Sequence, residues 1–293
     1  MSNKTSKSNF VIPEYTLLSQ IGLGAYGEVW LARGATNAYR AIKLVQRDRF
    51  RKASHYEREF DALCRIEKSI RNSPHLVQIH HVGRHDEEGF YYYVMDLADS
   101  LGSDVTDDAD GYTPTTLGAL LKAGALDANT ALDAAILLAK GLAKLHGAGM
   151  VHRDVKPSNV LFIGGKAHLG DLGLLVDELP DTGPLGTEGY VPPEGTGKPS
   201  GDLFGLGKII YEMVTGADRA EFPAIPSEIL VTGDWSTRNQ LLEIANQCAA
   251  PEVGQRYNTA DDLLTDLLEV RLNRPILSEK KRINRRTVTA GIL

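Results

Sequence analysis

Cysteines and long apolar runs are both scarce in this chain of 293 residues. Its two cysteines, Cys64 and Cys248, lie far apart, and neither belongs to a pair with the spacing of a zinc site. This excludes a disulfide framework and predicts two small buried side chains in a reducing compartment. No run approaches the roughly 18 to 20 apolar residues that span a bilayer, and residues 1–9 lack the apolar core of a signal peptide.

Basic residues are also scarce, except at the C-terminal end. Residues 271–293 hold seven Lys or Arg and one acid, whereas the rest of the chain holds 25 basic and 37 acidic side chains. The net charge of −6 therefore hides a body at −12. Domains that bind nucleic acid usually have a basic face, so we expect no nucleic-acid partner. The basic tail predicts either contact with anionic lipid or a solvated, disordered segment.

The first part of the chain has the pattern of a small sheet. β-Branched and aromatic residues bracket its glycines, which predicts strands. Between them, residues 53–70 place apolar side chains three or four positions apart with charges between, which predicts one amphipathic helix. The predicted strands cover residues 15–32 (two strands around a glycine turn), 39–46, 76–83 and 89–97.

From residue 117 onward the pattern predicts helices. The fold class is therefore α+β, with a small antiparallel β lobe that includes one helix and a larger, mainly α lobe. The predicted helices of the larger lobe cover residues 117–121, 128–146, 202–215, 237–249 and 259–272. The expected organisation is a polar tail at 1–13, a first lobe at 14–97, a second lobe at 98–270 with an acidic loop at 99–113, and the basic tail at 271–293.

Four polar residues at fixed spacings follow one another in the second lobe: Asp154, Lys156, Asn159 and Asp171. A lone aspartate in such a place is usually a solvated turn residue or a helix cap. Together, however, the four supply a carboxylate to orient a hydroxyl, a cation to hold a phosphate, and two oxygen ligands for magnesium. These are the requirements of phosphoryl transfer.

These segments resemble the catalytic loop and the metal-binding loop of protein kinases. The resemblance implies that Asp154 orients the substrate hydroxyl and accepts its proton, and that Lys156 neutralises the transferring phosphoryl group. It implies that Asn159 and Asp171 bind magnesium, or manganese in its place. The position of Lys156, two residues after Asp154, resembles that of the lysine in serine/threonine kinases. Leu172 replaces the usual phenylalanine but keeps an apolar packing residue, so activity is still expected.

A GxGxxG motif is formed by Gly22, Gly24 and Gly27. The motif also occurs in dinucleotide-binding folds and in plain hairpin turns. Here, however, a strand pattern follows the third glycine, and a later predicted strand contains Lys43. The resemblance to kinases implies that the turn covers a polyphosphate. The implied ATP-binding residues are Ile21, Gly22, Gly24, Ala25, Tyr26, Gly27, Val29, Ala41, Lys43, Met95, Asp96, Ala98 and Leu161.

Lys43 lies in an apolar strand, where a buried ammonium group needs a partner. In the kinase family this partner is a glutamate of the following helix. Glu59 is the expected partner, because Leu63 then lies one turn later on the same inward face. Glu57 is the alternative, because the phase of a helix is uncertain by a residue or two.

Residues 186–194 resemble the end of a kinase activation segment, with Pro193 in place of the usual alanine. The resemblance implies a buried ion pair between Glu194 and Arg256. It also implies that Asp202 holds the backbone of the catalytic loop, with a helix N-cap as the simpler interpretation.

Arg153 precedes the catalytic aspartate, and kinases with this arginine often depend on an anionic group in the activation segment. Thr187 matches the position that contacts the catalytic loop, which leaves Thr182 as the candidate phosphorylation site. Permanent charge from nearby acids is the alternative source. These acids are Asp177, Glu178 and Asp181.

The resemblance extends from about residue 15 to residue 268 and is strongest to bacterial serine/threonine kinases. It implies ATP- and magnesium-dependent phosphorylation of protein substrates in signalling, including autophosphorylation, in the cytoplasm or at the inner face of the membrane. A pseudokinase scaffold is one alternative, although none of its usual losses is present. A small-molecule phosphotransferase is another, although such enzymes usually lack a segment like 186–194. The sequence predicts no oligomeric state.

Overall fold

The computed structural model describes residues 10–24, 27–70, 73–102, 111–172, 176–177 and 186–276, with the backbone alone at 66–70 and 176–177. Several predictions concern positions outside this part of the chain. They are Ala25, Tyr26, Thr182, residues 103–110 of the acidic loop, and residues 277–293 of the basic tail.

Two compact units make up the chain. The first comprises Met1–Leu117 and Ser158–Val176, and the second Gly118–Pro157 and Asp177–Leu293. This division differs from the predicted boundary after residue 97. The reason is that a later hairpin joins the first unit through long-range hydrogen bonds, such as that from the Val77 amide to the Leu169 carbonyl (3.0 Å).

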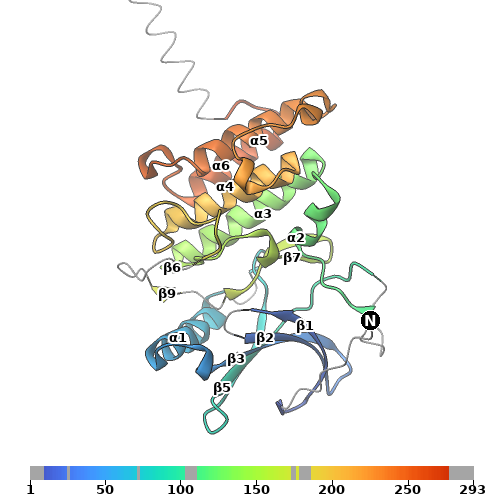
Figure 1. Ribbon diagram of the computed structural model, residues 1–293, viewed down its shortest axis with the longest axis vertical. Helices are drawn as coiled ribbons and strands as arrows, with labels where there is room; N and C mark the ends of the chain where they lie inside the picture. The colour runs from blue at the N-terminus through green and yellow to red at the C-terminus, as the bar shows by residue number, and fades with distance from the viewer. Residues whose placement is uncertain are drawn as a thin grey trace, which may run out of the picture. The chain divides into compact units, whose positions relative to one another are not determined.

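An antiparallel sheet of five strands forms most of the first unit, as predicted (Figure 1). Its order is β1-β2-β3-β5-β4, so that β3 and β5 pair at its centre. The strands are β1 (Tyr15–Leu23), β2 (Gly27–Gly34), β3 (Tyr39–Gln46), β4 (Ile79–His85) and β5 (Phe90–Met95). The hairpin consists of β7 (Val160–Ile163) and β8 (Lys166–Leu169).

Strand alternation decides which face of the sheet Lys43 occupies. Ile42 and Leu44 pack into an apolar cluster with Trp30 on one face. Successive side chains of a strand point to opposite faces, so Lys43 lies on the other face. There the register places Tyr93 of β5 directly opposite Lys43.

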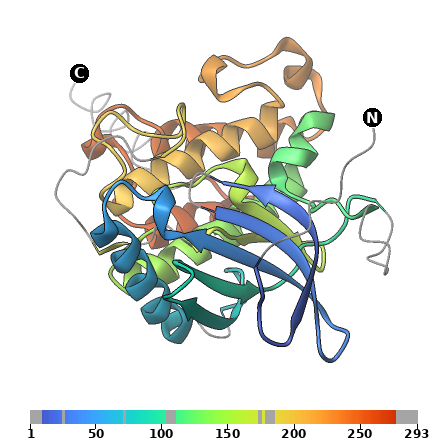
Figure 2. The same cartoon turned by 60° about the horizontal axis from the view of Figure 1, so that its bottom comes forward.

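Helix α1 (Ala53–Ile70) has the predicted bounds and lies beside the twisted blue strands in Figure 2. Tyr56, Glu59 and Leu63 are all buried, each three or four residues after the one before. This spacing places them on one face of the helix. The inward face therefore includes a carboxyl group as well as apolar side chains.

Four long helices form the second unit, in which α4 contacts both α3 and α5, and α6 packs on α3 (Figure 1). They are α3 (Ala128–Gly147), α4 (Pro199–Thr215), α5 (Trp235–Cys248) and α6 (Ala260–Arg271). Shorter elements are α2 (Leu117–Leu120), β6 (Met150–Val151) and β9 (Val176–Asp177). In the part of the chain that the structure describes, no helix is long and apolar enough to cross a membrane.

The beginning of α4 differs from the prediction. The helix starts at Pro199, with Lys198 at the N-cap, rather than at Asp202. Proline favours the first turn because its fixed φ suits the helix and its missing N–H would have no intrahelical partner there. Asp202 is thus inside the helix, and its interpretation as an N-cap is wrong.

Candidate active site

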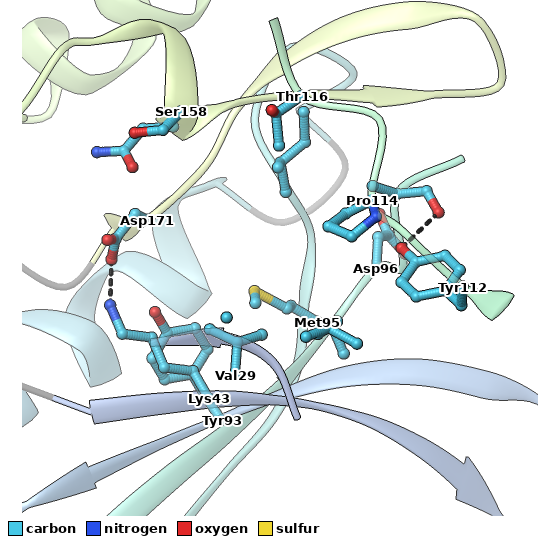
Figure 3. Close-up of a pocket in the computed structure, with 16 residues that line it drawn as sticks. Val29, Lys43, Tyr93, Met95, Asp96, Tyr112, Pro114, Thr116, Ser158 and Asp171 are labelled. Carbon is cyan, nitrogen blue, oxygen red and sulfur yellow. Dashed lines mark hydrogen bonds and ion pairs between the residues drawn. The ribbon is translucent and has the colours of Figure 1, made fainter. Parts of the chain in front are cut away.

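A pocket in the first unit is lined by residues of the glycine turn, the central strands and the β7–β8 hairpin (Figure 3). Most of the predicted ATP-binding residues line it: Ile21, Gly22, Val29, Ala41, Lys43, Met95, Asp96, Ala98 and Leu161. Gly24 and Gly27 belong to the turn beside it but are not among the lining residues.

Other lining residues were not predicted from the sequence. They are Tyr93, Tyr112, Pro114, Thr116 and Ser158. Tyr112 is buried, and its hydroxyl donates to the Ala98 carbonyl at 2.9 Å. Alternation along β5 could have identified Tyr93, which lies two residues before Met95 on the same face. No local signal marks Tyr112, because it returns to the pocket from the far end of the acidic loop.

The start of the acidic loop is anchored. The Asp99 carboxylate accepts hydrogen bonds from the backbone amides of Gly164 (2.9 Å) and Gly165 (2.8 Å). The sequence predicted an acidic loop from this residue onward. The described end of the loop is instead fixed by the turn between β7 and β8.

The glycine turn approaches β3 closely. The Gly24 amide donates to the Gly27 carbonyl at 2.8 Å. A Cβ on Gly27 would lie 1.9 Å from the Leu44 carbonyl oxygen. Position 27 therefore requires glycine, because any side chain would force β2 away from β3.

Lys43 forms an ion pair with Asp171 at one end of the pocket (Figure 3). Burial is the largest single influence and lowers the pKa of Lys43, but the charge and hydrogen bond of Asp171, together with the charges of Tyr93 and Glu59, outweigh it, and the net change of the pKa is upward. Tyr93 lies beside them, and burial raises the pKa of its phenol.

Glu59 does not form the predicted ion pair with Lys43 in the described structure. It is buried, accepts a hydrogen bond from the Tyr91 hydroxyl at 3.4 Å, and influences Lys43 only through its charge. Burial raises its pKa to about 8. Near neutral pH burial thus favours the protonated form of Glu59, whereas the Asp171 side chain is 37% exposed. The more exposed carboxylate, that of Asp171, is the one that pairs with the ammonium group.

Glu57, the alternative partner of Lys43, faces elsewhere. Its carboxylate binds the Arg84 guanidinium through two hydrogen bonds, of 2.6 and 3.0 Å, and its side chain is 41% exposed. Of the two glutamates, Glu59 is therefore the one on the buried face of α1.

Three polar side chains form a closed cluster in the second unit. The Lys156 ammonium lies 2.7 Å from the Asp154 carboxylate and donates to the Thr187 hydroxyl at 2.8 Å. The Thr187 hydroxyl donates to the other Asp154 oxygen at 2.9 Å. The cluster fixes the Asp154 carboxylate and joins it to the segment that begins at Gly186.

Asp202 holds the backbone just before this cluster. Its buried carboxylate accepts from the amides of His152 and Arg153, both at 2.8 Å, and lies 2.8 Å from His146 Nε2. Arg153 has a φ of 69°, which is unfavourable for a residue with a side chain. The carboxylate therefore stabilises a strained stretch of the loop.

The predicted ion pair between Glu194 and Arg256 is present. Two hydrogen bonds, of 2.5 and 3.0 Å, join the groups, and the Arg256 side chain is fully buried. The remaining Arg256 donor bonds go to the backbone carbonyls of Ala250, Ser200 and Pro251. The pair thus attaches the segment after Thr187 to the body of the unit.

The protein kinase domain family matches residues 15–280 of the chain. This match includes the residues that line the pocket and the cluster of Asp154, Lys156 and Thr187. The chain belongs to the protein kinase family.

The kinase is similar to several bacterial serine/threonine kinases, as its sequence predicted. It is 30% identical over 216 residues to "Serine/threonine-protein kinase PknA" of Mycobacterium tuberculosis, which covers 69% of this chain and 47% of that protein. It is 27% identical over 282 residues to "Probable serine/threonine-protein kinase CPE1738" of Clostridium perfringens, covering 88% of this chain and 38% of the relative. The chain thus spans less than half the length of each of these relatives.

The residues of the kinase pocket suit a magnesium ion bound together with a nucleotide. Asn159 is buried, and it lines the pocket together with Asp171. Magnesium is usually held by one or two carboxylates and by substrate phosphates rather than by a cage of protein ligands. The described residues contain no group of three His, Cys, Asp or Glu that could hold a metal. Leu172, which follows Asp171, is buried and packs as an apolar residue.

Proposed function

We propose that this protein kinase transfers the terminal phosphoryl group of ATP to serine or threonine hydroxyls of proteins. The observation with most weight is the cluster of Asp154, Lys156 and Thr187. It combines a carboxylate that can accept a proton with a cation that can neutralise a phosphoryl group. The similarity to bacterial serine/threonine kinases supports the choice of acceptor.

Each residue of the cluster has a distinct proposed role. Asp154 orients the acceptor hydroxyl and accepts its proton as the new bond forms. Lys156 stabilises negative charge on the transferring group. Thr187 holds Asp154 and Lys156 in register with the segment that presents the acceptor peptide.

The pocket of the first unit is the proposed nucleotide site. The apolar side chains of Val29, Ala41 and Leu161 suit the faces of an adenine ring, and Lys43 suits the phosphates. Asn159 and Asp171 would hold magnesium, which neutralises charge on the phosphates. Glu59 is proposed to position Lys43 once Asp171 is engaged elsewhere.

Two structural observations oppose the rival functions. A pseudokinase scaffold normally lacks a catalytic group, but Lys43, Asp154 and Asp171 are all present. A small-molecule phosphotransferase needs no peptide platform. Here, however, Thr187 binds the catalytic aspartate and Glu194 is anchored by Arg256.

The test is incorporation of radiolabelled phosphate into a generic protein substrate, with magnesium or manganese present. We expect Asp154→Asn to lower the rate by about a hundredfold to ten-thousandfold, the usual contribution of a general base. Asp218→Asn is the control, because Asp218 is an exposed aspartate of the same unit. No incorporation by the wild type would support a pseudokinase scaffold. Transfer only to small molecules would support a small-molecule phosphotransferase.

Autophosphorylation at Thr182 stays a prediction, because this residue lies outside the described part of the chain. Phosphopeptide mapping after incubation with ATP and magnesium tests it. An active enzyme with unmodified Thr182 would leave permanent charge from the neighbouring acids as the explanation for Arg153.

Location and membrane contact also stay predictions. We propose a cytoplasmic kinase whose basic tail, residues 271–293, contacts anionic lipid at the inner face of the membrane. The seven basic side chains of the tail support this, since each adds roughly 1 kcal/mol near such a surface.

A further inference from the structure

Arg49 lies in the short helical turn η1 (Arg47–Arg49), between β3 and α1, and reaches back to the glycine turn. One guanidinium nitrogen, Nη2, donates to the Glu28 carboxylate at 3.2 Å. The other, Nη1, makes a longer contact of 3.4 Å with the Gly24 carbonyl oxygen. One side chain thus contacts both ends of the turn that joins β1 to β2.

Each partner in this ion pair makes a second hydrogen bond to a neighbouring side chain. Arg49 Nε donates to the Gln46 side chain at 2.7 Å. The second carboxylate oxygen of Glu28 accepts from the Trp30 indole at 3.1 Å. The Arg49 and Glu28 side chains are only 28% and 19% exposed. These contacts fix the guanidinium group at the end of β3 and the carboxylate on β2, so the tether has two rigid ends.

Glycine turns are the part of a nucleotide site that most needs such support. Glycine loses more conformational freedom on ordering than any other residue. A turn that must order when a polyphosphate binds therefore weakens the affinity, and a contact that orders the turn beforehand removes this cost.

We propose that Arg49 is a positioning residue for the nucleotide, acting with Glu28 to hold Gly24 and the start of β2 in place beside the pocket. This inference rests on the proposed function of the pocket as a nucleotide site. Arg49 would contact no reacting atom, and its effect would be on nucleotide affinity rather than on the chemical step.

The experiment is calorimetric titration of the full chain with ADP and magnesium, alongside steady-state kinetics. We expect Arg49→Gln to raise the Kd for ADP by about tenfold, equivalent to about 1.4 kcal/mol, and the KM for ATP similarly, with kcat changed by less than about twofold. Glu28→Gln should have a similar effect. The double variant should bind ADP no more weakly than the weaker-binding single variant, because the effects of two residues that act through one contact are not additive.

Arg84→Gln is the matched control. Arg84 is an arginine of the same unit that also pairs with two acids, Glu57 and Asp86, and neither of these acids belongs to the glycine turn. It should lower the melting temperature without changing the Kd. Arg49→Lys should restore part of the affinity, since it keeps the charge but not the fork of donors.

Two results would overturn the proposal: an Arg49→Gln variant that binds ADP like the wild type, or an equal loss of affinity in Arg84→Gln. Loss of the chemical step alone would count against the proposed phosphoryl transfer but not against this role, because ADP binding is measured separately. A wild type that binds no nucleotide would overturn both.

Discussion

Charged groups are paired in different ways in the two units of this kinase. In the second unit each functional carboxylate has its partners in contact: Asp154 with Lys156, Glu194 with Arg256, and Asp202 with two backbone amides. In the first unit Glu59 is buried against a phenol, and Lys43 pairs with Asp171, a residue expected to bind metal.

The difference indicates that charge pairs serve different purposes in the two units. Removing one member of a buried pair is strongly destabilising because the other charge is left uncompensated. The pairs of the second unit therefore act as fixed supports, for the loop that carries Asp154 and for the segment after Thr187. In the first unit, the proposed role of Asp171 as a metal ligand requires it to exchange its contact with Lys43 for the metal, so we expect this pairing to change when a nucleotide binds.

The largest expected effect is on the buried pair of Glu194 and Arg256. We predict that Arg256→Met lowers the free energy of unfolding by about 3 to 5 kcal/mol. The substitution leaves Glu194 without its cation and also removes the hydrogen bonds that Arg256 donates to three backbone carbonyls. Urea denaturation followed by circular dichroism measures the loss.

Arg271→Gln is the matched control for this prediction. Arg271 pairs with Asp133 at side-chain exposures of 43% and 59%, and exposed pairs contribute about 0 to 1 kcal/mol. Similar losses in the two variants would show that the buried pair is not a special support, and the contrast between the units would fail.

A smaller loss is expected at Asp202. Asp202→Ala removes a charged acceptor from the amides of His152 and Arg153, and hydrogen bonds to charged groups contribute about 1.5 to 3 kcal/mol. The strained φ of Arg153 then loses the support of this carboxylate, so kcat should fall as well. Denaturation and steady-state kinetics check both effects. An unchanged kcat would mean that the catalytic loop keeps its shape without this support.

Much of the fold could be predicted because it depends on local patterns. The bounds of α1 follow from apolar spacing, and Glu59 could be placed on its inner face from the position of Leu63. Other bounds depended on distant partners. Leu76 was predicted to begin a strand, but it forms only an isolated bridge to Leu169, 93 residues later. β4 therefore begins at Ile79.

The site divides in the same way. Motif spacing identified Lys43, Asp154 and Asp171, but not that Lys43 would pair with Asp171 rather than with Glu59. This choice depends on how deeply each carboxyl group is buried, which the sequence does not show. The contact between Arg49 and the glycine turn is equally invisible in the sequence, because no motif includes both.

The expected effect at Glu59 is a dependence of stability on pH rather than a fixed loss. Burial raises its pKa from the ordinary value of 4.5 to about 8, so folding takes up a proton. The stability that the protonated group contributes is fully present below about pH 4.5 and is lost as the pH rises toward 8. Between these limits the free energy of unfolding should fall by up to about 1.4 kcal/mol per pH unit. Glu59→Gln cannot ionise and should remove this slope.

Glu57→Gln supplies a control of opposite sign on the same helix. The hydrogen bonds from Arg84 lower the pKa of Glu57, so the stability it contributes is present above its ordinary pKa and is lost only as the pH falls below that value. Between about pH 5.5 and 7.5 Glu57→Gln should therefore keep the wild-type slope, whereas Glu59→Gln should not. Denaturation curves over this range test both. If Glu59→Gln kept the slope, Glu59 would already be ionised in the folded protein. The first unit would then hold its charges in fixed pairs as the second does.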